Sequence, residues 1–352
     1  MSLWADKYRP RRLEDLHFHQ DITAHLTNLA QSEDFPHLLF YGPTGAGKKT
    51  RIAALLKEIY GDGVEKIRID ERPFVTSSNR KIIYTVVTSN YHLELQPSEL
   101  GVNDRVIVQE VIKETAQNQQ VFSGKHAFKV VIIDQADQLT RDAQAALRRT
   151  MEKYTTNIRF ILCCNHLNKI IAPIRSRCLL VRVPRPTTEA ATRMLQLVAQ
   201  KEDVLLPTPL AKSIVEQEHN DLRAALLSFE SIAVRHTDLQ DVQRAEKLDW
   251  DQMIGGIAHD ILKEQSPAML LVIRKKLYEL LTHCVPSTVI LKTLSLELFD
   301  SVNDEQLQRD ILDQTATHEY RLRIGRKDIF HLESYVANIM SVYKRFRNNI
   351  VL

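Results

Sequence analysis

The sequence predicts an α/β module, a parallel sheet with helices on both faces, followed by a small all-α region and a longer all-α region. Three observations lead to this prediction. Up to about residue 184, short apolar runs alternate with helical patterns, as expected for a parallel sheet covered by helices. Beyond that point strand-like runs disappear and helical periodicity takes over. The length of 352 residues also favours two or three domains over a single one.

The candidate strands of the first region are short and apolar. Each is bounded by turn or polar residues, and the continuity of each run predicts burial on both faces of the sheet. The candidate runs are residues 37–41, 81–88, 128–134, 157–164 and 178–183. We therefore expect one α/β domain over residues 1–184.

A small helical domain is expected over residues 185–245. Pro184 and Pro186 interrupt the chain at its start, because proline ends regular elements. Thr187 and Thr188, followed by a glutamate, can then cap a helix. The helical pattern begins directly after them.

A longer helical domain is expected over residues 246–352, after the polar stretch 236–249. Within it, residues 269–284 and 332–346 carry apolar side chains at three- and four-residue spacings, the pattern of amphipathic helices. Such apolar stripes either fill the domain's own core or form a surface on which other chains assemble. Periodicity leaves both interpretations open.

Composition indicates a folded, soluble class of protein. Hydrophobic residues make up 44% and charged residues 26%, which excludes a disordered or low-complexity chain. A net charge of +3 is too balanced to indicate nucleic-acid binding, so any basic surface must be local. The four cysteines lack the spacing of a zinc site, and a reducing compartment is expected. The sequence predicts neither a secretory leader nor a membrane span.

A glycine-rich loop follows the first candidate strand. Residues 42–48 (GPTGAGK) fit the GxxxxGK spacing, and a helical pattern comes after them. Backbone N–H groups of such a loop surround the β-phosphate of a nucleotide, and the lysine reaches the β- and γ-phosphates. The strand-loop-helix context favours this function over a merely structural turn. The expected phosphate-binding residues are Gly42, Pro43, Thr44, Gly45, Ala46, Gly47 and Lys48.

The motif departs from its usual form at the next position. A Ser or Thr hydroxyl there normally binds Mg²⁺, whereas this chain has Lys49. Thr50 follows, but one step along a helix rotates a side chain by about 100°, so Thr50 does not simply take over the ligand position. Nucleotide binding is therefore expected, whereas binding of Mg²⁺ is uncertain.

A second acidic motif is indicated at residues 128–137 (FKVVIIDQAD), where a buried strand ends in Asp134. This aspartate could hold Mg²⁺ directly or through water. Active ATPases of the AAA+ type place a Glu next, but this chain has Gln135, whose amide cannot accept a proton from water. The alternative is an ordinary strand followed by a polar turn. Together with Lys49, this departure favours binding without efficient hydrolysis.

Five segments resemble the small subunits of replication factor C, the eukaryotic AAA+ machine that loads the ring-shaped sliding clamp onto primed DNA. The segments are residues 3–10 (LWADKYRP), 42–49 (GPTGAGKK), 142–154 (DAQAALRRTMEKY), Asn165 and 174–178 (IRSRC). The resemblance extends over essentially the whole chain. Lys49, with SNYHLEL at 89–95 and YELLTHC at 278–284, makes it most similar to the subunit type with a degenerate ATPase site.

The resemblance implies a P-loop AAA+ domain over 1–184, a helical lid over 185–245 and a helical collar over 246–352 that joins five subunits. It implies ATP or ADP as the ligand. Asn165 would be the first sensor of the γ-phosphate, with a turn Asn as the alternative. Arg223 would be the second sensor, with a solvated helix arginine as the alternative. Further nucleotide contacts are expected at Tyr8, Arg9, Pro10, Lys49, Thr50 and Asp134.

By the same resemblance, Arg177 would act in trans as an arginine finger in a neighbouring subunit's ATP site. A planar guanidinium binds spread phosphoryl charge, and such fingers contribute about 10³ to 10⁵ in rate in other nucleotidases. Arg175 lies two positions earlier, so a surface loop with two arginines is the alternative.

The implied partners are four other subunits, the sliding clamp and a primed DNA junction, with no membrane. DNA would be held through its phosphates, because a loader accepts any sequence. The candidate contacts are Arg105, Lys113, Arg141, Arg148 and Arg149. For each of them a solvated face or an intersubunit salt bridge is an equal alternative. Clamp contacts cannot be assigned to residues, and nuclear localisation follows from the resemblance alone.

The expected function is a nucleotide-binding subunit of the clamp loader with little or no hydrolysis of its own. An active ATPase is one alternative, in which Asp134 and a repositioned Thr50 hold Mg²⁺. A pure scaffold with an empty nucleotide site is the other.

Overall fold

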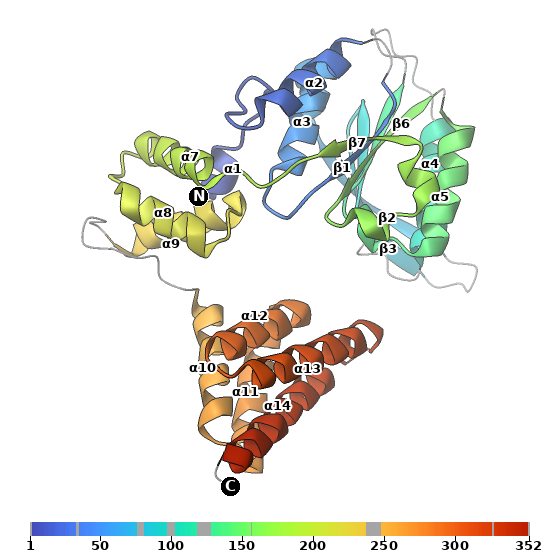
Figure 1. Ribbon diagram of the computed structural model, residues 1–352. Coiled ribbons are helices and arrows are strands. Elements are labelled where there is room, and N and C mark those ends of the chain that lie inside the picture. Colours follow the sequence, from blue (N-terminus) through green and yellow to red (C-terminus); the bar gives the residue numbers. More distant parts are fainter. Residues whose placement is uncertain are drawn as a thin grey trace. The chain divides into compact units, whose positions relative to one another are not determined.

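The computed structural model describes residues 2–32, 35–75, 81–96, 103–117, 128–155, 157–236, 248–325 and 327–350 (Figure 1). The chain divides into two compact units, residues 1–245 and 246–352, which are described separately. The first contains a sheet module and three further helices, and the second is entirely helical in its described part.

Seven strands of the described chain form one mixed sheet in the order β2-β3-β4-β5-β6-β1-β7. The strands are β1 (His37–Tyr41), β2 (Arg68–Val75), β3 (Lys81–Thr88), β4 (His92–Leu95), β5 (Lys129–Ile133), β6 (Ile158–Cys164) and β7 (Cys178–Arg182). The strands from β4 to β7 in this order run parallel, as predicted. The β2–β3 and β3–β4 pairs are antiparallel, so the sheet is not parallel throughout. The sequence did not predict β2 or β4.

Helices cover both faces of the sheet (Figure 1). Alternate residues of a strand point to opposite faces. In β1, Leu38 and Phe40 pack with α2 and α3, whereas Leu39 packs with α4 and α5. The helices are α2 (Gln20–Gln31), α3 (Lys48–Tyr60), α4 (Asp104–Gln117) and α5 (Arg141–Lys153). Burial on both faces explains why the central strands read as unbroken apolar runs.

Short helical turns connect these elements. They are η1 (Gly61–Glu65), η4 (Ala136–Gln138), η5 (Leu167–Lys169) and α6 (Ala172–Arg175). Two of them follow the ends of β5 and β6, where loops meet at the carboxyl edge of the parallel strands. This edge is where ligands bind in open α/β sheets.

A three-helix segment completes the first unit, with α7 (Thr188–Lys201), α8 (Thr208–Gln217) and α9 (Leu222–Arg235). The Thr187 hydroxyl accepts a hydrogen bond from the Ala190 N–H and caps α7. The segment also holds the start of the chain through α1 (Trp4–Lys7). The Trp4 ring lies 5.1 Å from that of Phe229, and the backbone N–H of Trp4 donates to Oε2 of Glu230 at 3.0 Å.

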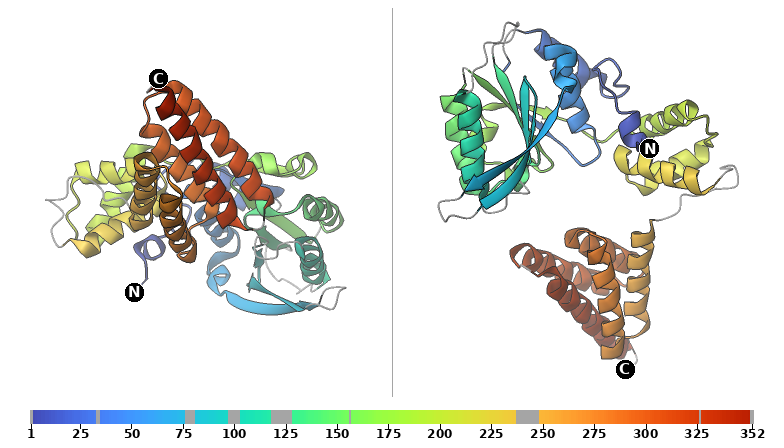
Figure 2. Two further views of the ribbon diagram at one scale, coloured as in Figure 1. Left: turned by 90° about the horizontal axis from the view of Figure 1, so that it is seen from below. Right: turned by 180° about the vertical axis from the view of Figure 1, so that it is seen from behind.

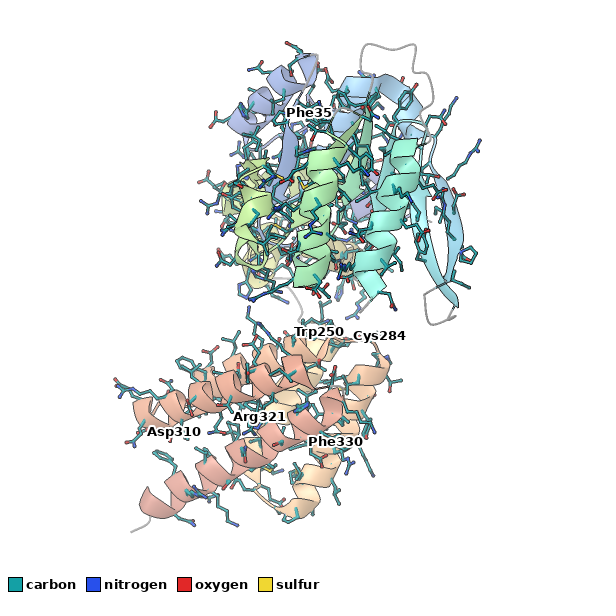
Figure 3. All side chains as sticks on the ribbon, turned by 90° about the vertical axis from the view of Figure 1, so that its right-hand side faces the viewer. Phe35, Trp250, Cys284, Asp310, Arg321 and Phe330 are labelled. Carbon is teal, nitrogen blue, oxygen red and sulfur yellow. The ribbon has the colours of Figure 1, made fainter. Side chains whose placement is uncertain are left out.

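The described part of the second unit is a set of packed helices (Figure 2). These helices share an apolar core of their own. They are α10 (Asp249–Lys263), α11 (Pro267–Thr282), α12 (Ser287–Asp300), α13 (Glu305–Ile324) and α14 (Asp328–Ile350). The two amphipathic stretches of the sequence lie mainly in α11 and α14, where Leu277 and Tyr335 are fully buried. Figure 3 labels Trp250 in α10 and Phe330 in α14, and half of the Phe330 surface is exposed. In the described chain, no helix combines the length and apolarity that a membrane crossing requires.

Candidate nucleotide-binding site

The glycine-rich loop joins β1 to α3 at the carboxyl edge of the sheet. Gly47, with φ +85°, is the last residue before α3 and takes a left-handed conformation that glycine adopts at little cost. Gly45 has φ +66°, and a Cβ there would lie 1.7 Å from Oδ1 of Asp221. Asp221 caps α9 by accepting from the N–H groups of Arg223 and Ala224. Glycine therefore allows the loop to approach the start of α9.

A cavity of about 670 Å³ lies over this loop. It brings together most of the residues that the sequence predicted. They are Tyr8, Arg9, Pro10, Thr44, Gly45, Ala46, Gly47, Lys48, Lys49, Thr50, Asp134, Asn165 and Arg223. Gly42 and Pro43 are not among the lining residues, but their carbonyl groups hold the lysine of the loop.

The cavity also has an apolar part that the sequence analysis missed. Phe18 precedes α2, and four further apolar lining residues come from α7 and α9. They are Met194, Val198, Leu222 and Leu226. A planar base can pack against such a surface while its phosphates lie over the loop. No local pattern marks these residues, because only the tertiary fold brings the three segments together.

Lys48 is almost completely buried, with 8% of its surface exposed. Its ammonium donates to the carbonyl oxygens of Gly42 and Pro43, both at 2.7 Å, and to Oδ1 of Asn165 at 2.8 Å. Burial lowers the pKa of Lys48 below its ordinary value. All three donors of this ammonium thus point to neutral acceptors, which a phosphate oxygen can replace.

Asn165 directly follows β6 and lines the cavity. Its side-chain oxygen contacts Lys48, and its N–H donates to Oδ1 of Asp137 at 3.5 Å. Asp137 is buried in η4, two residues after Gln135. The Asn165 side chain is therefore one of the three acceptors that hold the Lys48 ammonium.

Lys49 lies against the acidic residue at the end of β5. Its ammonium is 2.8 Å from Oδ2 of Asp134 and 3.5 Å from Oε1 of Glu94. Burial acts to lower the pKa of Lys49, but the hydrogen bond to Asp134 and the charges of both carboxylates raise it above its ordinary value. Lys49 therefore stays charged. The sequence did not identify Glu94, because its strand, β4, was not predicted.

The residues present do not fit a magnesium ion. The ammonium of Lys49 already occupies the contact to Asp134, the one carboxylate that the motif provides. The Thr50 hydroxyl accepts instead from Nε of Arg9 at 3.2 Å. Among the residues described here, no group of three or more His, Cys, Asp or Glu side chains could hold a metal ion.

Gln135 lines the cavity directly after Asp134. It has a left-handed backbone with φ +48° and begins the turn η4. The neutral amide can bind a water molecule but cannot take its proton. The residue directly after Asp134 therefore offers no base to the cavity.

Arg177 lies outside the lining of this cavity, in the loop between α6 and β7. Its Nη2 atom is 2.6 Å from Oε1 of Glu152 in α5, and Nη1 donates to the Pro173 carbonyl at 2.7 Å. The side chain remains partly exposed, with an accessible fraction of 37%.

Arg223 is exposed in the first turn of α9 and faces the cavity. The predicted DNA contacts lie on α4 and α5, which pack side by side (Figure 1). Arg105, Lys113, Arg141 and Arg149 are exposed. Arg148 is half-buried, and its Nε atom lies 3.5 Å from Oε1 of Glu152. This ion pair lies within the chain, not between subunits.

The α/β module with its phosphate loop, followed by helical units, defines the class as AAA+ proteins. A solved structure of a point mutant of Thermotoga maritima RuvB shares the fold, with a TM-score of 0.51 and 14% identity. The match covers 76% of this chain and 85% of that chain.

The particular family follows from sequence relatives. The chain is 52% identical to replication factor C subunit 5 of Neurospora crassa, over 98% of both chains. It is 48% identical to replication factor C subunit 3 of Mus musculus, over 98% of this chain and 97% of the relative. Residues 250–347 match the family model "Replication factor C subunit 3, C-terminal domain", and residues 18–187 match "DNA polymerase III, delta subunit". The chain belongs to the replication factor C subunit family.

Proposed function

We propose that this chain is a nucleotide-binding, largely non-hydrolysing subunit of the replication factor C clamp loader. In this role it joins four other subunits in the nucleus, where the assembly uses ATP to open the sliding clamp and load it onto primed DNA. Family membership supports the assembly role. The single observation that carries the specific role is the combination of an intact phosphate lysine with Lys49 held against Asp134.

Nucleotide binding is supported by both ends of the cavity. The loop and the first turn of α3 offer N–H donors and Lys48 to phosphates. The apolar side chains of α7 and α9 offer a surface for adenine. A volume of about 670 Å³ falls within the usual range for sites of small ligands.

Slow hydrolysis is supported by two independent features. Gln135 cannot act as a base, and lost general-base catalysis costs about 10² to 10⁴ in rate. Thr50 is engaged by Arg9, which counts against the alternative in which Thr50 serves as a repositioned metal ligand. An active ATPase is therefore disfavoured.

Arg177 is proposed to reach the nucleotide of a neighbouring subunit. Its guanidinium is held at 2.6 Å by Glu152, so a partner's phosphates must compete with this carboxylate for it. The exchange replaces one exposed ion pair, worth up to about 1 kcal/mol, by charge-assisted bonds to phosphate oxygens. The cost of releasing Arg177 is small by comparison.

The test is clamp- and DNA-stimulated ATP hydrolysis by the reconstituted five-subunit complex. Arg177→Ala is expected to remove most turnover at the neighbouring site, because such fingers contribute about 10³ to 10⁵ in rate. Lys48→Ala in this subunit is expected to change the total rate little. Arg175→Ala, the same charge change two residues earlier, is the matched control.

A large loss with Lys48→Ala and none with Arg177→Ala would contradict both the silent site and the finger. An equal loss with Arg175→Ala and Arg177→Ala would indicate a general charge effect of the loop. If the wild-type complex retains no nucleotide in this subunit, the chain is a scaffold with an empty site.

A further inference from the structure

Three charged side chains form a cluster at the edge of the cavity. Lys49 in the first turn of α3 lies between Asp134 at the end of β5 and Glu94 in β4. Asp134 is buried, with 5% of its side chain exposed, whereas the side chains of Glu94 and Lys49 are 32% and 48% exposed. Asp134 is thus a buried carboxylate whose positive partner belongs to the chain itself.

The cluster determines how much cationic charge the site can accept. A buried carboxylate needs a partner, because removing a charge from water is costly. Lys49 provides that partner at 2.8 Å from Asp134. A divalent metal bound to the same carboxylate would lie next to the ammonium of Lys49, and the two cations would repel each other.

The ammonium also retains capacity for a ligand. An ammonium has three donors and no acceptor. Two of those donors suffice for Asp134 and Glu94, so one remains for a phosphate oxygen. Because Lys49 lines the same cavity as Lys48, a polyphosphate over the loop lies within reach of both side chains.

We propose that Lys49 replaces the divalent metal ion, so that this site binds the polyphosphate of an adenine nucleotide without Mg²⁺. Lys49 then bridges Asp134 to a phosphate oxygen, as a metal ion bridges protein and nucleotide in other phosphate-loop proteins. The inference rests on the proposed nucleotide binding and adds the cofactor requirement. A chelator therefore does not release nucleotide from this subunit.

The test uses the purified full-length chain and isothermal titration with ADP, in magnesium buffer and in EDTA. The wild-type chain is expected to bind with affinities that differ by less than about 3-fold between the two buffers. Lys49→Thr restores the hydroxyl that ordinarily binds the metal and leaves Asp134 free of its ammonium. Its affinity is expected to become about 10-fold weaker in EDTA than in magnesium, the effect of about one charge-assisted interaction.

Lys57→Thr is the matched control. Lys57 lies on the same helix and is also held by two carboxylates, Asp62 at 3.2 Å and Glu65 at 2.7 Å. It does not line the nucleotide cavity. This variant is expected to bind ADP as the wild type does in both buffers, so a change specific to Lys49→Thr supports the inference.

The comparison of ADP affinity in magnesium buffer and in EDTA can be made on the wild-type chain alone. It tests the inference even if Lys49→Thr folds poorly. A wild-type affinity that falls 10-fold or more in EDTA overturns the inference and leaves the proposed nucleotide binding intact. Absence of binding in both buffers overturns the two proposals together. As a second readout, Mn²⁺ added with ADP should give no bound-metal electron paramagnetic resonance signal in the wild type, and such a signal would count against the inference.

Discussion

Two residues of the candidate site differ from the hydrolytic pattern, and they act by different physics. Lys49 changes electrostatics, because it fills the contact to Asp134 with a fixed positive charge. Gln135 changes proton transfer, because an amide has no basic oxygen comparable to a carboxylate. Replacing one of these two residues by the one found in the hydrolytic pattern leaves the other departure in place.

Gln135→Glu alone is therefore expected not to produce magnesium-dependent ATP hydrolysis by the full-length chain. The new carboxylate would supply a base, but Lys49 would still hold Asp134. Single-turnover hydrolysis of ATP measures the effect, with Lys49→Thr combined with Gln135→Glu as the comparison. Substantial turnover in the single variant would show that Lys49 is not an obstacle.

At the scale of elements, the sequence predicted the strands that read as unbroken apolar runs and missed those with mixed character or few residues. The expected burial on both faces is confirmed for β1, β5 and β6. It is wrong for β3 and β7, which lie toward the edges of the sheet, where Ile83 is 69% and Leu180 43% exposed. Strand β2 (RIDERPFV) mixes charged and apolar residues without alternation, with three charged residues in succession at 70–72, and contains Pro73. It lies at the edge of the sheet, where proline and charge are tolerated. Strand β4 (HLEL) has only four residues, too few for a periodic signal.

The sequence predicted the site residues that belong to motifs and missed those that reach the cavity through an unpredicted strand or through tertiary packing. Residues within the motifs, such as Lys48 and Asp134, could be identified because spacing along the chain encodes their chemistry. Glu94 was missed together with β4, and Phe18 and Leu226 reach the cavity only through tertiary packing.

Strand β4 also contains a buried titratable group, His92. Burial, helped by the charge of Lys129, lowers the pKa of His92 to about 4, and Nδ1 lies 2.7 Å from the Ser89 hydroxyl. In the unfolded chain His92 has the ordinary histidine pKa of about 6.5. As the pH falls, His92 is therefore protonated in the unfolded state before it is protonated in the folded state. Between about pH 6.5 and pH 4 His92 therefore lowers the free energy of unfolding, by about 3 kcal/mol in total.

Urea unfolding of the full-length chain at pH 7 and pH 5 tests this expectation. Between pH 7 and pH 5 the wild type is expected to lose about 2 kcal/mol of unfolding free energy through His92, and His92→Gln, which cannot titrate, is expected to remove this loss. His17→Gln, at an exposed histidine, is the control and should leave the loss unchanged. An equal pH response in the wild type and in His92→Gln would contradict this account.

At the scale of the whole molecule, the two compact units have separate apolar cores. The second core centres on fully buried side chains of α11 and α14, including Leu277 and Tyr335. Units with independent cores unfold as separate cooperative transitions when few contacts connect them.

Leu277→Ala is therefore expected to destabilise only the unit formed by residues 246–352. Truncating a buried leucine costs about 2 to 5 kcal/mol through lost burial and the cavity left behind. Differential scanning calorimetry of the full-length chain should show one transition at lower temperature and the other unchanged. A single transition that moves as a whole would mean that the two units unfold cooperatively.

The start of the chain is attached at both sides of the nucleotide cavity. Trp4 packs on Phe229 of α9, and five residues later Arg9 donates to Thr50 of α3. Five residue steps span at most about 17 Å when fully extended. While both contacts hold, this segment acts as a tether, and its length limits how far the three-helix segment can move from the phosphate loop.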